Sequence, residues 1–240
     1  MKLTTPITRR LGSALVFFEL AVVFCLTATH AQQAPPPAQK QTAGTGAVNL
    51  TATSANVREP GGSVRINILR WSTDEERNSL VVAMNPPPPA PAPAADAAGG
   101  RGARGRGGRG EAPAPKGPVD PIVALTAAIG KEPTVGYIWT SEVVGYSIKY
   151  AYRVSLPDGG ERIILATDRR LGANTTAWTP AASATLTNYD FTLFEIRLDS
   201  KGLGQGKTSL TTKVIVDNEA KTVALDNYAA TPAILQNVKR

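Results

Sequence analysis

Residues 146–168 read YSIKYAYRVSLPDGGERIILATD, and this stretch predicts a β-hairpin. Every second residue from 146 to 156 is large and apolar, with smaller or polar residues between; the two sets are Tyr146, Ile148, Tyr150, Tyr152, Val154 and Leu156, and Ser147, Lys149, Ala151, Arg153 and Ser155. This period of two is typical of a half-buried strand. Pro157-Asp158-Gly159-Gly160 predicts the turn, because proline fixes φ and glycine accepts positive φ. Residues 162–167 then return as the partner strand.

The same alternation recurs on both sides of this hairpin. Val64, Ile66 and Ile68 alternate with Arg65 and Asn67, while Thr192, Phe194, Ile196 and Leu198 alternate with Glu195 and Arg197. Further strands are expected over 210–216, 223–225 and 234–238, with turns at the glycines of 202–206 and at Asp217-Asn218. The connections are short, which favours antiparallel pairing.

Two helices are expected between the early strands. Ser72-Thr73-Asp74-Glu75 predicts a capping box that opens a helix carrying Leu80, Val81 and Met84. Asp120-Pro121 predicts an N-cap followed by proline at the first helical position. Ile122, Leu125 and Ile129 then share one helical face, and Gly130 suits the C-terminal cap.

The sequence therefore predicts an α+β fold. We expect a mostly antiparallel sheet of about seven to nine strands, curved or barrel-like, with two short helices packed at one end or on one face. The predicted domain spans 47–240 and is expected to be monomeric.

Residues 1–31 have the features of a secretory signal peptide. Lys2, Arg9 and Arg10 form a basic start, residues 11–28 are mostly apolar, and Ala31 ends a small-residue cleavage pattern. We expect cleavage near Ala31 and export to the periplasm or the extracellular space. The alternative is an uncleaved N-terminal membrane anchor.

The one cysteine and the one histidine of the chain, Cys25 and His30, both lie in this segment. The expected mature chain therefore has no cysteine nucleophile, histidine base or disulfide, and no zinc site of the usual nitrogen and sulfur ligands. We predict no catalytic residues, no metal and no cofactor.

Two low-complexity segments accompany the predicted domain. Residues 32–46 form an Ala/Gln/Pro/Thr-rich tether, and residues 85–118 form a Pro/Ala-rich then Arg/Gly-rich insertion that interrupts the domain. Their composition predicts disorder. Of the net charge of +7, the signal segment contributes +2 and residues 85–118 contribute +3, so the folded surface is nearly balanced. A basic nucleic-acid-binding face is therefore not expected.

Aromatic residues crowd the predicted strands and their loops, which suggests a site for a small apolar or sugar ligand. The candidate ligand-binding residues are Trp71, Trp139, Tyr146, Tyr150, Asp168, Arg169 and Trp178. The long segment 169–188 suits a mobile rim for such a site. The alternative is that these rings fill the core.

Carboxylates offer a second hypothesis, because Asp168, Asp190, Glu195 and Asp226 lie in or beside predicted strands. A glycosidase needs two carboxyl groups that face one sugar. Glu195 and Arg197 share one strand face and are interpreted as a surface ion pair. The segment 202–208 is similar to a phosphate-binding loop but joins two strands, so it is interpreted as a turn.

Several blocks resemble an uncharacterised family of exported bacterial proteins. They are RWSTDEER (70–77), VGYIWT (135–140), IILATDR (163–169), FTLFEIRLD (191–199), GQGKTSLTTK (204–213) and VALDNYAATPAILQNVK (223–239). The resemblance implies a small secreted α+β domain, with residues 85–118 as an insertion peculiar to this chain. It implies no activity, ligand or catalytic residue.

These observations favour an exported, non-enzymatic binding or envelope-associated protein. One alternative is a carboxylate-dependent hydrolase that acts on envelope polysaccharide. Another is a binder of anionic polymers or nucleic acid through the Arg/Gly tract, although that tract lacks the interleaved aromatic residues of RNA-binding segments.

Overall fold

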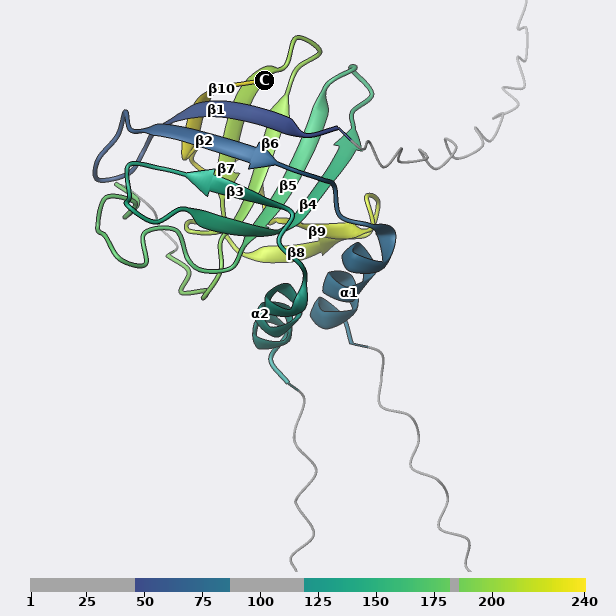
Figure 1. Ribbon diagram of the computed structural model, residues 1–240. Coiled ribbons are helices and arrows are strands. Elements are labelled where there is room, and N and C mark those ends of the chain that lie inside the picture. The colour runs from purple at the N-terminus through teal and green to yellow at the C-terminus, as the bar shows by residue number, and fades with distance from the viewer. Residues whose placement is uncertain (1–45, 87–118, 182–185) are drawn as a thin grey trace, which may run out of the picture. The chain divides into compact units, whose positions relative to one another are not determined.

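The protein folds as an eight-stranded antiparallel β-barrel with a helix pair and a separate β-hairpin on its outside (Figure 1). This computed structural model describes residues 46–86, 119–181 and 186–240. The elements are β1 (Val48–Ser54), β2 (Ser63–Ile68), α1 (Asp74–Met84), α2 (Pro121–Lys131), β3 (Gly136–Trp139), β4 (Tyr146–Ser155), β5 (Glu161–Thr167), β6 (Leu193–Leu198), β7 (Leu203–Thr208), β8 (Val214–Asp217), β9 (Thr222–Leu225) and β10 (Leu235–Lys239).

The barrel has the strand order β1-β10-β7-β6-β5-β4-β3-β2 and closes through the pairing of β1 with β2. Every neighbouring pair is antiparallel. The predicted α+β class with a barrel-like antiparallel sheet is confirmed, and its eight strands fall within the predicted number. The β8–β9 hairpin forms a separate two-stranded sheet.

One hydrophobic core fills the inside of the barrel. The inward positions of β2 and β6 are the predicted ones, so Arg65, Asn67, Glu195 and Arg197 point outward. The inward core residues of the strands are Leu50, Ala52, Val64, Ile66, Ile68, Ile138, Tyr146, Ile148, Ala151, Ile163, Leu165, Phe194, Ile196, Leu198, Leu235 and Val238. A closed barrel of eight strands has just enough interior to be filled by side chains in this way.

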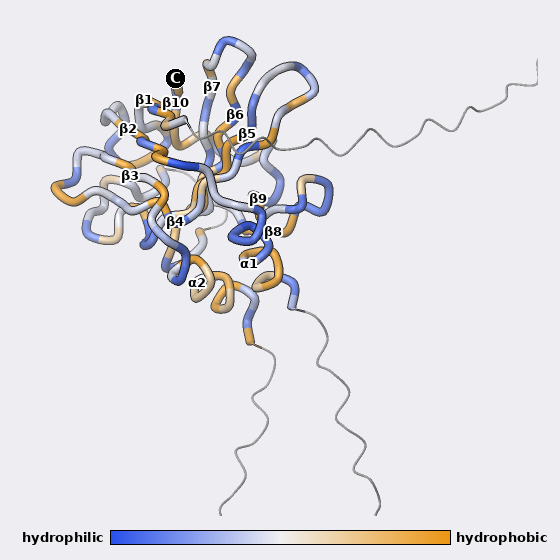
Figure 2. The backbone as a smooth tube through the Cα atoms, turned by 45° about the vertical axis from the view of Figure 1, so that its right-hand side comes forward, coloured by the Kyte–Doolittle hydropathy of each residue, from blue (hydrophilic) through white to orange (hydrophobic). Residues whose placement is uncertain are grey.

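A second core lies on the outside of β4, β5 and β6. There α1, α2 and the β8–β9 hairpin bury an apolar layer against the barrel wall: Leu80, Leu125, Ile129, Tyr150, Tyr152, Ile164, Leu193, Val214, Val223 and Leu225 belong to it. Figure 2 shows that α2 is hydrophobic along most of its length, as expected for a helix packed on this layer. The helices thus pack on one face of the sheet.

For residues 146–156, the prediction of which side chains point into the barrel is wrong in the second half. Tyr146 and Ile148 point into the barrel as expected, but the β4–β5 register shifts between Ile148 and Tyr150. This β-bulge adds one residue and reverses the faces beyond it. Ala151 therefore points inward, and Tyr150 and Tyr152 point outward into the second core.

Both predicted helices form, but α1 begins at a different cap residue and α2 ends later than predicted. The N-cap of α1 is Thr73, whose side chain accepts from Glu76 N–H while Glu76 accepts from Thr73 N–H. Ser72 is one residue too early, because its hydroxyl instead accepts a hydrogen bond from Ala151 N–H in the core. Asp120 and Pro121 begin α2 as predicted. Gly130 lies inside that helix, which ends before the extended residue Glu132 since Pro133 follows.

Of the three glycines predicted to form a turn, Gly202 lies in the turn and the other two lie in a strand. Gly204 and Gly206 belong to β7, and the turn is formed by residues 199–202, where Asp199 Oδ1 accepts from Lys201 N and Leu203 N at 2.8 and 2.9 Å. A Cβ on Gly204 would lie 1.8 Å from the Arg197 carbonyl oxygen, so the strands approach too closely for a side chain. The predicted strand over 210–216 is reduced to β8.

Other expectations lie outside the described residues. These are the signal peptide 1–31 with Cys25 and His30, nearly all of the tether 32–46 and of the insertion 85–118, and part of the segment 169–188. Within the described part of the chain, neither helix has the length and hydropathy needed to cross a membrane.

Candidate ligand-binding face

The outer surface of β1, β2 and β3 is the part of the barrel wall that presents aromatic rings to solvent. On β4–β6 the helices and the β8–β9 hairpin cover the wall, whereas Thr51, Arg65, Tyr137 and Trp139 are exposed. Figure 1 shows β1, β2 and β3 on the side of the barrel away from β5 and β6. We call the outward residues Asn49, Thr51, Arg65, Asn67, Tyr137 and Trp139 the β1–β3 face.

Strand register arranges this face in two rows. Asn49 pairs with Asn67, and Asn67 pairs with Tyr137. In the next row, Thr51 pairs with Arg65, and Arg65 pairs with Trp139. Directly opposed residues of antiparallel strands have side chains in contact range. Each aromatic ring therefore has polar or charged side chains beside it.

Tyr137 and Trp139 form a tilted aromatic pair. They lie two residues apart on β3, so both point outward, and their ring centroids are 6.1 Å apart with the planes inclined at 34°. Their exposed fractions are 39% and 41%. A Cβ on Gly145 would lie 2.7 Å from Trp139 Cε3, so the indole is seated directly against the glycine. The rings form a fixed apolar platform.

The polar side chains next to the rings retain hydrogen-bonding capacity. Asn67 Nδ2 donates to Asn49 Oδ1 at 2.7 Å. In the described part of the structure this is the one protein hydrogen bond of either amide, so Asn67 Oδ1 and Asn49 Nδ2 are available to a ligand. Each side-chain amide has four hydrogen-bonding sites, two donors and two acceptor lone pairs, and this bond uses one of them on each residue.

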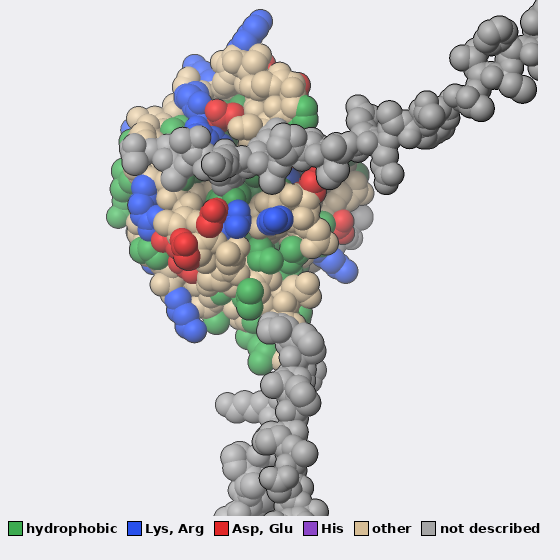
Figure 3. Space-filling view, turned by 90° about the vertical axis from the view of Figure 1, so that its right-hand side faces the viewer, with side chains coloured by type: hydrophobic (Ala, Val, Ile, Leu, Met, Phe, Trp, Pro, Cys, Tyr) green, Lys and Arg blue, Asp and Glu red, His purple; other side chains and the backbone are tan. Residues whose placement is uncertain are grey.

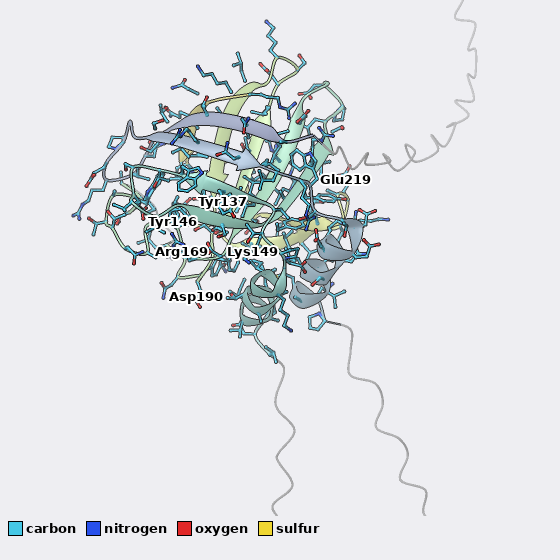
Figure 4. All side chains as sticks on the ribbon, in the orientation of Figure 1. Tyr137, Tyr146, Lys149, Arg169, Asp190 and Glu219 are labelled. Atoms are coloured by element: carbon cyan, nitrogen blue, oxygen red, sulfur yellow. The ribbon has the colours of Figure 1, made fainter. Side chains whose placement is uncertain are left out.

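The loop of residues 140–145 beside Trp139 is held by Tyr146 and Arg169 (Figure 4). The Tyr146 hydroxyl donates to Glu142 Oε1 at 2.6 Å and accepts from Gly172 N–H at 2.9 Å. The Arg169 guanidinium lies 4.4 Å from the Tyr146 ring centroid and donates to Gly145 O at 2.7 Å. Burial, together with the bond to Glu142, raises the pKa of Tyr146, so its hydroxyl stays protonated.

This anchored loop presents two apolar side chains to solvent. Val143 is 99% exposed and Val144 is 59% exposed, at the end of the barrel next to the aromatic pair. A loop whose base is tied by a buried hydroxyl and an arginine has little freedom to withdraw these side chains. The two valines therefore extend the apolar part of the surface.

Four of the predicted ligand-binding residues lie in this region. Trp139 belongs to the β1–β3 face, and Tyr146 and Arg169 support the loop beside it. Asp168 lies next to Arg169, and its Oδ1 accepts from Ser147 N at 3.1 Å. Only Trp139 presents an exposed ring, since Tyr146 is fully buried.

The other three predicted residues lie in the cores. Trp71 and Trp178 are buried in the barrel core. Tyr150 is in the second core, where its hydroxyl shares a 2.7 Å hydrogen bond with Thr222 Oγ1. These three rings pack inside the hydrophobic cores, as the alternative interpretation of the aromatic residues proposed. The predicted set also omitted Tyr137, which the alternation in VGYIWT would have placed beside Trp139.

Glu195 and Arg197 form the predicted ion pair, but Glu195 is buried and not at the surface. Its side chain is 0% exposed, with Oε1 2.8 Å from Arg197 Nη2 and 3.0 Å from Arg162 Nε, while Oε2 accepts from Leu225 N at 3.2 Å. Arg162 also contacts Asp217 at 2.6 Å. The β8–β9 hairpin covers this position, so the prediction of exposure is wrong. A carboxylate held this way is structural.

The remaining candidate carboxylates are dispersed. Asp168 follows β5, Asp190 precedes β6, and Asp226 follows β9, all three exposed. Among the described residues there is no group of three or more acidic, cysteine or histidine side chains that would hold a metal. The surface seen in Figure 3 has acidic and basic side chains side by side rather than a field of one sign.

A small cavity of about 80 Å³ lies at the end of the barrel near Trp178. Its lining includes Arg170, Leu171, Thr175, Leu210 and other residues of the 170–180 segment, none of them acidic. Binding sites for small molecules are typically about 300–1,000 Å³. This cavity is too small for a sugar, and its described lining residues include no carboxylate or histidine.

The chain matches no protein-family model, no curated protein and no solved structure. The family resemblance of the sequence blocks stays a prediction.

Proposed function

We propose that this chain is an exported, non-enzymatic glycan-binding protein and that the β1–β3 face is its binding site. The observation that carries the proposal is the exposed Tyr137–Trp139 pair, fixed on a barrel wall and bordered by the amides of Asn49 and Asn67. The sequence pattern of residues 1–31 supports export.

A sugar matches the chemistry of this face better than a purely apolar ligand does. Sugar rings present C–H groups on their faces, which pack against the negative π-face of an aromatic ring, and hydroxyl groups at their edges. The aromatic pair supplies two such π-faces, and Asn49, Asn67 and Thr51 supply donors and acceptors beside them. A wholly apolar partner would cover Asn67 Oδ1 and Asn49 Nδ2 without offering them a hydrogen bond.

The geometry gives less support to a hydrolase. Hydrolysis of a glycoside needs two carboxyl groups on either side of one bond. In the described part of the chain, Glu195 is buried against Arg162 and Arg197, and no cleft brings two of the other candidate carboxylates together. Binding without cleavage is therefore the proposed activity.

The test is affinity electrophoresis of the purified exported protein through gels that contain soluble polysaccharides, with the wild type compared with the double variant Tyr137→Ala/Trp139→Ala. Aromatic residues at binding surfaces each contribute about 1–2 kcal/mol or more. Two such contributions sum to about 2–4 kcal/mol, so we expect the double variant to bind weaker by a factor of about 30 or more, since each 1.4 kcal/mol corresponds to a factor of ten.

Leu203→Ala is the matched control, because Leu203 is an exposed apolar residue on β7 that is not part of the β1–β3 face. This control is expected to migrate like the wild type. Equal retardation of the wild type and the double variant would contradict the proposed site, and absence of retardation in every polysaccharide would contradict the proposed function.

A further inference from the structure

Arg65 is the charged residue of the β1–β3 face, and no carboxylate of the described residues pairs with it. Most other described arginines are paired: Arg70, Arg77, Arg162, Arg197 and Arg240 each lie within 3.0 Å of an Asp or Glu oxygen. Arg65, by contrast, has no ion pair or side-chain hydrogen bond with any residue that the structure describes, although it is exposed. Its guanidinium retains its full donor capacity.

Arg65 is placed directly beside the aromatic platform. It is the cross-strand partner of Trp139 on β2 and of Thr51 on β1. On the other side of Tyr137, β4 contributes Ser147, the cross-strand partner of Tyr137, and then Lys149 two residues later (Figure 4). Lys149 likewise lacks a described carboxylate partner. Arg65 thus lies beside Trp139, and Lys149 lies diagonally from Tyr137 on the side away from Trp139.

We infer that the ligand of this face is an acidic glycan, in which a sugar ring stacks on Tyr137 and Trp139 while its anionic group binds Arg65. This inference rests on the proposed function and specifies its ligand class. Arginine presents a planar fork of donors that matches a carboxylate or a phosphate in a bidentate arrangement. An anion at this position would pair the one charged group of the β1–β3 face.

Single-stranded nucleic acid also combines anions with stackable rings, but this face fits it less well. Proteins that bind single strands use a positively charged groove that follows the phosphate backbone. Here Lys239 on β10, the cross-strand partner of Thr51, is the next cation in the row of Arg65. The carboxylates of Glu142 and Asp168 lie on the segments next to the aromatic pair, so the positive charge does not continue past it. The asparagine and threonine side chains favour a ligand rich in hydroxyl groups and sparse in charge.

The test compares polygalacturonate with the same polymer after full methyl esterification, which removes the charge and keeps the sugar. A poly(glycerol phosphate) polymer, which carries anions and no sugar ring, tests whether charge alone is recognised. Dissociation constants are measured by isothermal titration for wild type, Arg65→Gln and Lys149→Gln, with Lys221→Gln in the β8–β9 turn as the control for an exposed cation away from this face.

We expect the wild type to bind polygalacturonate about tenfold more tightly than its methyl ester, because hydrogen bonds to charged groups are stronger than neutral ones. Arg65→Gln should lose this preference and keep its affinity for the methyl ester, and Lys221→Gln should behave as wild type. Arg65-dependent binding of poly(glycerol phosphate) as tight as that of polygalacturonate would overturn the inference, because that polymer has no sugar ring to stack on Tyr137 and Trp139.

Equal affinity for the charged and esterified polymers, or an Arg65→Gln variant that keeps the preference, would overturn the acidic-glycan inference. The proposed function would survive that result if Trp139→Ala still abolished binding of the neutral polymer. Tighter Arg65-dependent binding of polyuridylate than of any polysaccharide would overturn the inference in favour of nucleic acid.

Discussion

Glu195 is held by two arginines and a backbone amide in a position fully closed to solvent. Removing one partner of a buried ion pair leaves uncompensated charge, at a cost of about 3–5 kcal/mol. Glu195→Gln is therefore expected to lower the free energy of unfolding by about that amount, measured by urea denaturation. The matched control is Glu219→Gln, which is exposed and should change stability by less than about 0.5 kcal/mol. A loss below about 1 kcal/mol for Glu195→Gln would contradict this assignment.

Replacing either of two glycines by alanine is expected to change stability in opposite directions. Gly130 lies inside α2, and no atom lies within 4 Å of the position that a Cβ would occupy there, so Gly130→Ala should stabilise the protein by about 0.5–1 kcal/mol. Gly204→Ala should prevent correct pairing of β6 with β7, since the added carbon would lie 1.8 Å from Arg197 O. Thermal unfolding of both variants checks this; a Gly204→Ala protein as stable as wild type would contradict the strand register.

At the scale of elements, the start of α1 gives a pH-dependent prediction. The hydrogen bond from Arg70 holds the pKa of Glu76 below its ordinary value of 4.5, and the bond from Thr73 N–H acts in the same direction. A depressed carboxyl pKa contributes stability that is present above the unfolded-state pKa and is lost as pH falls through the folded-state pKa. The difference in unfolding free energy between wild type and Glu76→Gln should therefore be present at pH 7 and shrink below pH 4.5.

Urea denaturation of both proteins at several pH values measures this difference. Glu59→Gln serves as the control, because Glu59 is exposed and has no ion pair with a described residue. A difference that stayed constant down to strongly acidic pH would show that Glu76 contributes through its shape rather than its charge.

How far an element could be predicted depended on how its two faces differ. In β2 and β6, polar and apolar residues alternate cleanly, so the inward faces were predicted correctly. Strand β4 packs against a core on both faces, and its alternation of tyrosine with alanine or lysine does not mark the bulge after Ile148. The glycines of β7 indicated a turn because glycine is common there, but close strand approach also requires it.

At the scale of the whole molecule, the position of the covering layer decides which aromatic residues are available. Tyr150 and Tyr137 are both outward-facing strand tyrosines, yet the helices and the β8–β9 hairpin bury the first and leave the second exposed. Sequence alone identified an aromatic-rich sheet and included Trp139 in the candidate site. It did not indicate which wall of the barrel the helices would cover, because that depends on contacts between distant segments.

The central claim is that Trp139 contacts a glycan, and its direct test is acrylamide quenching of tryptophan fluorescence with and without a soluble polysaccharide that retards the wild-type protein. Trp71 and Trp178 are 8% and 4% exposed, so the quenchable emission belongs to Trp139, which is 41% exposed. We predict that saturating polysaccharide protects this emission and that Trp139→Phe removes the protected component. Unchanged quenching in the presence of the bound polysaccharide would contradict the account.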